Sequence, residues 1–445
     1  MDGGSDGGTT KDRGTTCEEL CCAAILAFFA VQGAVPFIAP NQALEATREP
    51  ATRLMFYGGV GSQLVVYGAI VFLLLRQASR VVRWLRAMQW ALPLAALAVA
   101  SVAWSQFPLY TVRRALPFAL AGVFGLYLAV RYPVRRQLAI LRIAMLALAA
   151  GTVVMALGFP HLGLDASAGH HADWQGVFTQ KNACGRMMVL ATAVLLADWK
   201  PSWQRVASGV LFLLVMYMSG SRSAWLIEAV LLALRAGLIV AKRLDARGRV
   251  LSALAGLWIT AASAIAAYVW MPALLAWMGR DATLSGRTLI WKQTWVFICE
   301  RPWLGWGYDA FWRGTRGEAF RVVAAVHFMV FHAQNGFLEI WLELGGTGLV
   351  LFALSYLRGW QRLWPVLRRG EVDRVMWMVF VLALILLYDL DENSLLIYNG
   401  LFWTLYVAAL ANVEFLAVED RLHVRLAAER FVERSALEAS AAVSQ

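Results

Sequence analysis

Long apolar runs alternate with short charged connections along most of this chain. A run of about 20 apolar residues is enough for an α-helix to cross about 30 Å of hydrocarbon. About twelve such runs can be counted, which predicts an all-α polytopic integral membrane protein with about twelve transmembrane helices. The predicted spans are 17–39, 54–75, 88–104, 115–131, 138–157, 183–197, 206–219, 223–241, 250–278, 333–357, 375–388 and 395–416.

The segments outside this transmembrane domain, which we place at residues 17–416, differ from it in composition. Residues 1–16 are rich in Gly, Ser, Thr and Asp, which predicts a disordered cytoplasmic tail. Residues 417–445 are charged and rich in Ala, which predicts a cytoplasmic C-terminal helix or tail. Within the domain, the connection 279–331 is much longer than the others, and its apolar and aromatic positions predict short helices.

Composition agrees with a membrane protein. The chain is 60% hydrophobic, which is more than one soluble core of this size could bury. Its net charge of +11 could indicate binding to nucleic acid, but an excess of Lys and Arg in a membrane protein first indicates topology. We therefore expect membrane lipids as neighbours and no nucleic acid. If both termini lie inside, most cations fall on inward connections, and the long connection 279–331 lies outside.

A second set of cations then falls on the outward side, where membrane insertion does not require them. These residues come from four connections and have Gly, Ser or Asn nearby: Arg113, Arg114, Lys181, Arg186, Arg222 and Arg287. The rigid guanidinium fork of arginine suits phosphate oxygens, so converging cations could hold a diphosphate without a metal. The alternative is that they pair with lipid headgroups or with nearby carboxylates.

His332 stands at the outer end of the predicted span 333–357. Helical spacing places Asn335, Glu339 and Glu343 on the same face, as a polar stripe that descends into the membrane. An unpaired carboxylate is costly there, so the stripe must face other helices or a wet cavity. A polar clamp between helices is the alternative, above all for Glu343. A histidine beside diphosphate-binding cations indicates a general base that deprotonates a hydroxyl while the cations stabilise the departing phosphate.

Acidic residues in the last outward connection could orient this imidazole. They are Asp389, Asp391 and Glu392, and the alternative is an ordinary solvated loop. The sequence has few signs of a metal site. The five cysteines make no ligand pattern, and His170 and His171 are adjacent, so on a helix their side chains would diverge. We therefore expect neither a metal nor another cofactor.

The motifs that carry these residues resemble the O-antigen ligase family and its superfamily of O-antigen polymerases and protein O-oligosaccharyltransferases. The likeness extends over roughly residues 20–416. It is strongest in the segment from His332 to Asn335, followed by Leu338, Glu343 and Gly345. Weaker likenesses lie at 179–185, 221–222, 285–291 and 301–307.

The resemblance implies a transferase of the inner membrane of a Gram-negative bacterium, with its active site facing the periplasm. It would transfer a polysaccharide from undecaprenyl diphosphate to lipid A-core, with inversion and without a metal. His332 would be the general base, and Arg222 and Arg287 would hold the diphosphate. The candidate substrate-binding residues are Lys181, Arg186, Gln334, Asn335, Arg113, Arg114 and Asp389.

Other functions remain open at this point. The single long connection favours a ligase over an O-antigen polymerase, which usually has two large periplasmic loops. The lack of extra soluble segments disfavours a protein O-oligosaccharyltransferase. A lipid-linked glycan transporter or flippase belongs to another class, and it would be expected to hold its cations at mid-membrane on broken helices. Here they lie at the outer ends of spans.

Overall fold

The computed structural model describes residues 8–33, 50–85, 88–165, 173–252, 256, 287–313 and 317–443. Within these residues the fold is all-α, and one isolated bridge joins Leu164 to Trp174. The helices are α1 (Gly8–Ala30), α2 (Pro50–Arg76), α3 (Ala78–Leu85), α4 (Leu92–Ala100), α5 (Pro108–Arg131), α6 (Val134–Gly158), α7 (Pro160–Gly163), α8 (Lys181–Ala197), α9 (Trp203–Met218), α10 (Arg222–Lys242), α12 (Arg287–Glu300), α13 (Ala319–Val326), α14 (Gly336–Arg368), α15 (Val372–Asp391) and α16 (Leu401–Val443).

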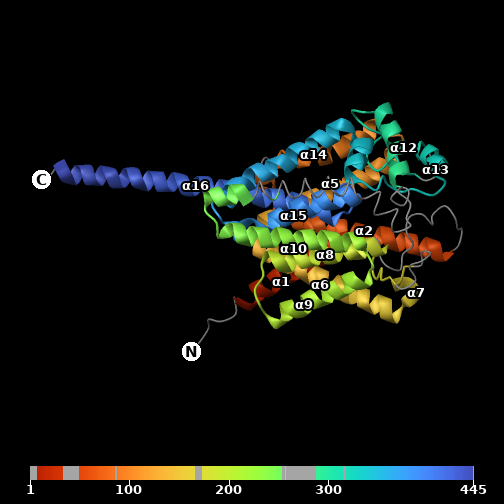
Figure 1. Ribbon diagram of the computed structural model, residues 1–445, viewed down its shortest axis with the longest axis horizontal. Helices are drawn as coiled ribbons and strands as arrows, with labels where there is room; N and C mark the ends of the chain where they lie inside the picture. The colour runs from red at the N-terminus through yellow and green to blue at the C-terminus, as the bar shows by residue number, and fades with distance from the viewer. Residues whose placement is uncertain are drawn as a thin grey trace.

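The long helices form a bundle that runs along the long axis of the molecule (Figure 1). The short helices α12 and α13 lie at one end of this bundle. The first residues of α1 lie toward the opposite end, and the last part of α16 projects beyond that end (Figure 1). Both ends of the described chain are therefore on the side away from α12 and α13, as expected if both termini share one side of the membrane.

Six described helices are long and apolar enough to cross a membrane, so the polytopic all-α class is confirmed. They are α2, α5, α6, α10, α14 and the first part of α16. Other predicted spans correspond to shorter apolar helices, such as α9, or to helices such as α8, which has 17 residues. The predicted span 250–278 lies almost entirely outside the described residues. The total of about twelve therefore stays a prediction.

Several predicted boundaries need correction. The helix expected over 333–357 is α14, which begins at Gly336 and continues to Arg368, with a kink at Gly345 (φ 68°, ψ −174°). A side chain at Gly345 would collide with the backbone of Trp303, so the kink allows the long connection to approach α14 closely. At the ends of the chain, α1 begins inside the tail predicted to be disordered, and α16 continues without a break into the segment 417–443.

Close helix packing at the centre of the bundle places α5 against α16. The Trp403 indole stacks on Phe118 with ring centroids 4.5 Å apart and donates a hydrogen bond to the Phe118 carbonyl at 2.9 Å. A side chain at Gly125 would meet the Thr404 carbonyl, so glycine lets the two backbones approach closely. Phe118 and Trp403 both belong to the main hydrophobic core of the bundle.

The described part of the long connection folds over the first part of α14. It contains α12 and α13, and these helices contribute to a small apolar core that includes Phe297, Trp306 and Phe311. Its backbone joins α14 at the kink, where Gly307 donates to the Glu343 carbonyl at 2.9 Å and Gly346 donates to the Pro302 carbonyl at 2.7 Å. The connection is thus a packed cap, and it fixes α12 beside the start of α14.

Candidate active site

His332 lies in an irregular turn between α13 and α14 and not on the helix itself. The backbone of the next residue, Ala333, is held from two sides. Its N–H donates to Glu339 Oε2 at 2.6 Å, and its carbonyl accepts from Trp291 Nε1 at 3.0 Å. Gln334 follows with φ 51°, in the left-handed region, which turns the chain into the helix. Helices α12 and α14 together therefore position the half-buried imidazole.

The imidazole has a defined hydrogen-bond arrangement. The Gln334 N–H donates to His332 Nδ1 at 3.1 Å, so the neutral ring has its lone pair on Nδ1 and its proton on Nε2. Burial lowers the pKa of His332, Arg186 and Arg287 lower it further, and Glu392 opposes them. A pKa below the usual value for histidine leaves the ring neutral at pH 7, which is the state that can accept a proton.

Two of the predicted cations converge near His332 on one segment at the end of α15. Arg186, from α8, is only 3% exposed, and its Nη1 lies 3.4 Å from both Glu392 Oε2 and the Asn393 carbonyl. Arg287, the first residue of α12, donates from Nη1 to Asp391 Oδ1 and to the Asp391 carbonyl, both at 2.9 Å. The structure therefore brings together an imidazole, two guanidinium groups and two carboxylates.

Lys181 and Arg222 lie at the starts of two neighbouring helices. Lys181 begins α8 and pairs with Asp173 at 2.7 Å. Arg222 begins α10, is exposed, and forms no ion pair with a described residue. The two helix starts are close, because a side chain at Gly185 would meet the Ser221 Cβ at 2.7 Å. Arg222 is not among the cations that lower the pKa of His332.

Arg113 and Arg114, near the start of α5, have different surroundings. Arg113 is exposed. Arg114 pairs with Asp309 at 3.4 Å and lies over the Tyr398 ring, 3.6 Å from its centroid. Burial raises the pKa of Asp309, and the Arg114 charge opposes this effect. These contacts connect α5 to the long connection and give Arg114 a structural role in the described residues.

Asn335 and Asp389, both predicted to bind substrate, join α14 to the end of α15. The Asn335 side chain accepts from the Leu338 N–H at 3.0 Å and so caps α14. Asp389 is fully buried, and its Oδ1 accepts from the Ser394 N–H and hydroxyl, both at 2.8 Å. A side chain at Gly336 would collide with the Asp389 carboxylate. Both residues have structural contacts that position the acidic segment next to the His332 turn.

The predicted polar stripe on α14 is covered by protein. Glu339 and Glu343 are 1% and 3% exposed. Glu339 holds the Ala333 N–H, and the backbone of Glu343 receives the long connection at the kink. This arrangement agrees with the alternative of a polar clamp. The sequence pattern does not reveal the role of Glu339, because it predicts helix for the turn before α14. The signal that marks the turn is Asn335, since an Asn before an apolar helical run is a capping signal.

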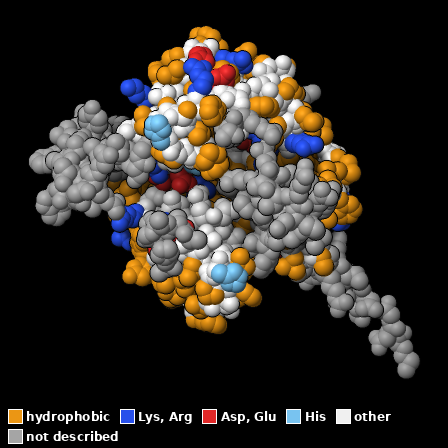
Figure 2. Space-filling model, turned by 90° about the vertical axis from the view of Figure 1, so that its right-hand side faces the viewer, with side chains coloured by type: hydrophobic (Ala, Val, Ile, Leu, Met, Phe, Trp, Pro, Cys, Tyr) orange, Lys and Arg blue, Asp and Glu red, His pale blue; other side chains and the backbone are white. Residues whose placement is uncertain are grey.

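Figure 2 shows this end of the molecule from outside, with basic and acidic side chains next to each other among apolar ones. Among the described residues, no group of three His, Cys, Asp or Glu side chains could hold a metal ion. His170 and His171 lie outside those residues. The absence of a metal or other cofactor therefore stays a prediction.

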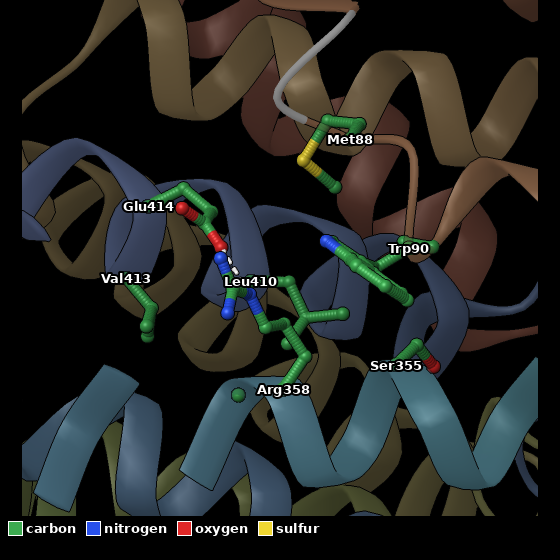
Figure 3. A pocket seen from close by; sticks show the side chains of 9 residues that line it. Met88, Trp90, Ser355, Arg358, Leu410, Val413 and Glu414 are labelled. Atoms are coloured by element: carbon green, nitrogen blue, oxygen red, sulfur yellow. Dashed lines mark hydrogen bonds and ion pairs between the residues drawn. The ribbon is translucent and has the colours of Figure 1, made fainter. Parts of the chain in front are cut away.

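A pocket elsewhere in the bundle does not contain any of the candidate residues. It lies between α14 and α16 and is lined by Trp90, Ser355, Arg358 and Glu414, among others (Figure 3). Arg358 Nε donates to Glu414 Oε1 at 3.1 Å across it. This ion pair lines the pocket, which holds none of the candidate residues, so the His332 region remains the candidate active site.

Two comparisons with known proteins bear on this site. Residues 207–353 match the family model described as O-Antigen ligase. The chain is also similar to the exopolysaccharide production protein ExoQ of Rhizobium meliloti (strain 1021), with 27% identity over 308 residues, which cover 66% of this chain and 70% of the relative. The matched segment contains Arg222, Arg287 and His332. The resemblance predicted from the motifs is confirmed, and residues 207–353 of this multi-pass membrane protein carry the domain of the O-antigen ligase family.

Proposed function

We propose that this protein transfers a glycan from undecaprenyl diphosphate to an acceptor hydroxyl on the periplasmic side of a bacterial inner membrane. One observation carries the proposal: the His332 turn lies beside the end of α15, where Asn335 Nδ2 donates to the Leu390 carbonyl at 3.4 Å. Two guanidinium groups meet on that same segment, Arg287 at 2.9 Å from Asp391 and Arg186 at 3.4 Å from Glu392. An imidazole can accept the hydroxyl proton, and guanidinium groups can stabilise the charge on a departing diphosphate.

The chemical step is a single displacement. The acceptor oxygen forms a bond to the anomeric carbon, its proton passes to the lone pair on His332 Nδ1, and the carbon–oxygen bond to the diphosphate breaks. The bonding electrons leave with undecaprenyl diphosphate, which the cations stabilise. Attack opposite the leaving group inverts the anomeric carbon. In the structure the Gln334 N–H occupies the Nδ1 lone pair, in the place that the acceptor hydroxyl takes during transfer.

The acceptor that we propose is lipid A-core, which makes the protein an O-antigen ligase. The family description supports this acceptor. The single long connection in the sequence, residues 279–331, also favours a ligase over a polymerase. The exposed Arg222, which has no ion-pair partner among the described residues, is available to bind a diphosphate or an anionic acceptor.

A second candidate is a polymerase that extends an exopolysaccharide. It is favoured by the similarity to a protein named for exopolysaccharide production. The chemical step would be the same, but the acceptor hydroxyl would belong to a second lipid-linked glycan.

Reconstitution of the purified full chain in liposomes distinguishes these functions. With lipid-linked glycan and lipid A-core, a ligase attaches the glycan to lipid A-core. A polymerase makes longer lipid-linked glycans when lipid A-core is left out. Donor binding or movement without either product would contradict the proposed transfer and indicate a transporter. The same assay in a chelator should give full activity, and loss that a divalent ion restores would contradict the metal-free mechanism.

A further inference from the structure

Arg186 and Arg287, the two cations that lower the pKa of His332, are each paired with a carboxylate of the same short segment. Arg287 pairs with Asp391 at 2.9 Å, and Arg186 pairs with Glu392 at 3.4 Å. The N–H groups that hold these carboxylates are those that a diphosphate would need. A bound diphosphate must therefore compete with the segment for both guanidinium groups.

Arg186 has a vacant donor in this arrangement. The residue is 3% exposed, and its buried Nε–H has no hydrogen-bond partner among the residues that the structure describes. A buried guanidinium donor without a partner is costly, and the 3.4 Å contact to Glu392 is long for a charged hydrogen bond. Arg186 is thus incompletely satisfied by the protein, as expected of a group that receives an anionic ligand.

The end of α15 lies beside the His332 turn, where Asn335 Nδ2 donates to the Leu390 carbonyl at 3.4 Å. Of the three acidic residues there, Glu392 is the one whose charge raises the pKa of His332. Asp389 is held by Ser394 and Leu395, and Asp391 is held by Arg287. Glu392 is 8% exposed, contacts Asn182 at 3.2 Å and favours the charged form of His332. The other charges that face His332, Arg186 and Arg287, have the opposite effect.

We infer that Glu392 is the positioning residue of His332, and that the donor diphosphate brings it into this role by displacing it from Arg186. The inference rests on the proposed function. The ring already has the required tautomer, with its proton on Nε2 and its lone pair on Nδ1. Once released, the Glu392 carboxylate accepts a hydrogen bond from Nε2–H and stabilises the imidazolium that forms when Nδ1 takes the hydroxyl proton.

This exchange couples donor binding to activation of the base. Without donor, Glu392 is shared with Arg186 and Asn182, and His332 is a weak base. With donor bound, the diphosphate neutralises the two cations that disfavour the imidazolium, and the carboxylate is free to favour it. Proton transfer from the acceptor therefore becomes favourable only when a glycan is in place.

The test is the pH profile of transfer by Glu392→Gln, which keeps the size of the side chain and removes its charge. We expect kcat to fall about 10- to 100-fold, within or below the range for general-base catalysis, while the donor KM does not rise. The acid limb of the kcat profile should move to lower pH, because loss of the carboxylate lowers the pKa of His332 and activity is lost only when the ring is protonated.

Asp391→Asn is the matched control. It removes the carboxylate paired with Arg287 and should lower the donor KM, but it should leave the acid limb of the kcat profile in place. Glu392→Asp keeps the charge at a shorter reach, and its kcat should lie between those of the parent protein and Glu392→Gln.

An unmoved acid limb in Glu392→Gln, a raised donor KM with unchanged kcat, or equal kcat for the Asp and Gln variants would overturn the inference. These results differ from a failure of the proposed function. In that case His332→Ala would still transfer glycan. If His332→Ala is inactive and Glu392→Gln has the parent pH profile, only the role of Glu392 is wrong.

Discussion

Arginine–carboxylate pairs occur at both ends of the bundle, but their surroundings differ. At the end with α12 and α13, the side chains of Arg186 and Glu392 are 3% and 11% exposed. At the opposite end, those of Arg374 and Glu419 are 36% and 53% exposed. Exposed pairs contribute about 0–1 kcal/mol, whereas burying a pair has a desolvation cost that can exceed its Coulombic gain.

The difference in exposure suggests that the two groups of ion pairs have different roles. The more exposed group also includes Arg369, Glu371 and Asp420. Its arginines lie at or next to the connection between α14 and α15, where excess positive charge is typical of the inward side of a membrane, and Glu419 and Asp420 lie on α16. The buried group has a long contact and a vacant Arg186 donor, so stability does not account for it. Pairs of the same residue types are thus more exposed at one end and, on the proposed function, bind a ligand at the other.

The largest expected effect in this comparison comes from Arg186, which is buried, and from Arg287, whose side chain is 26% exposed. Arg186→Lys and Arg287→Lys keep the charge but lose the fork, so each should reduce glycan transfer about 100-fold or more in the liposome assay. Arg374→Lys, at the exposed end, is the matched control and should transfer at the parent rate. Equal activity in all three would show that bulk positive charge is sufficient and that the two ends do not differ in function.

A smaller effect is expected at Trp291, which lies on α12 and donates a hydrogen bond to the turn that contains His332. Trp291→Phe keeps an aromatic ring but loses the hydrogen bond to the Ala333 carbonyl, so the imidazole is less well positioned. We expect kcat to fall about 10-fold with little change in donor KM, since misplacement of a catalytic group costs rate. Trp295→Phe, on the same helix, is the control because its indole is 48% exposed. A larger loss in the control than in Trp291→Phe would contradict this positioning role.

The smallest effect should come from removal of an exposed pair. Arg374→Gln loses contacts to Glu371, Glu419 and Asp420, all of them exposed or partly exposed. Thermal unfolding in detergent should report a change within about 1 kcal/mol, and glycan transfer by correctly inserted protein should be unchanged. A loss of several kcal/mol would mean that this network stabilises the fold far more than its exposure suggests.

Sequence patterns predicted the membrane class, and they singled out His332 and a set of cations predicted to face outward. They did so because spans are long apolar runs and because cations on the outward side conflict with the insertion rule. The structure brings two of these cations, Arg186 and Arg287, to one segment at the end of α15. The turn at His332 was mistaken for helix, since Ala333 and Gln334 fit a helical pattern. The reason lies in tertiary contacts: Trp291 and Glu339 hold Ala333, and Asn335 caps the helix that follows.

The pairing of the cations could not be predicted at all. Arg186 and Glu392 are separated by 206 positions, and Arg287 and Asp391 by 104. Which acid meets which base depends on how α8, α12 and α15 pack, and nothing local to any of these residues encodes that. The number of spans was also uncertain, because α8 has only 17 residues and α15 has charged residues near both ends.

The central claim is that His332 takes the proton of the acceptor hydroxyl at a diphosphate-binding site. The most direct test compares His332→Ala with the parent protein in liposomes, with donor binding and glycan transfer measured on the same preparation. The account predicts that donor binding is retained and that transfer falls at least about 100-fold. Transfer at the parent rate by a correctly inserted His332→Ala protein would contradict it.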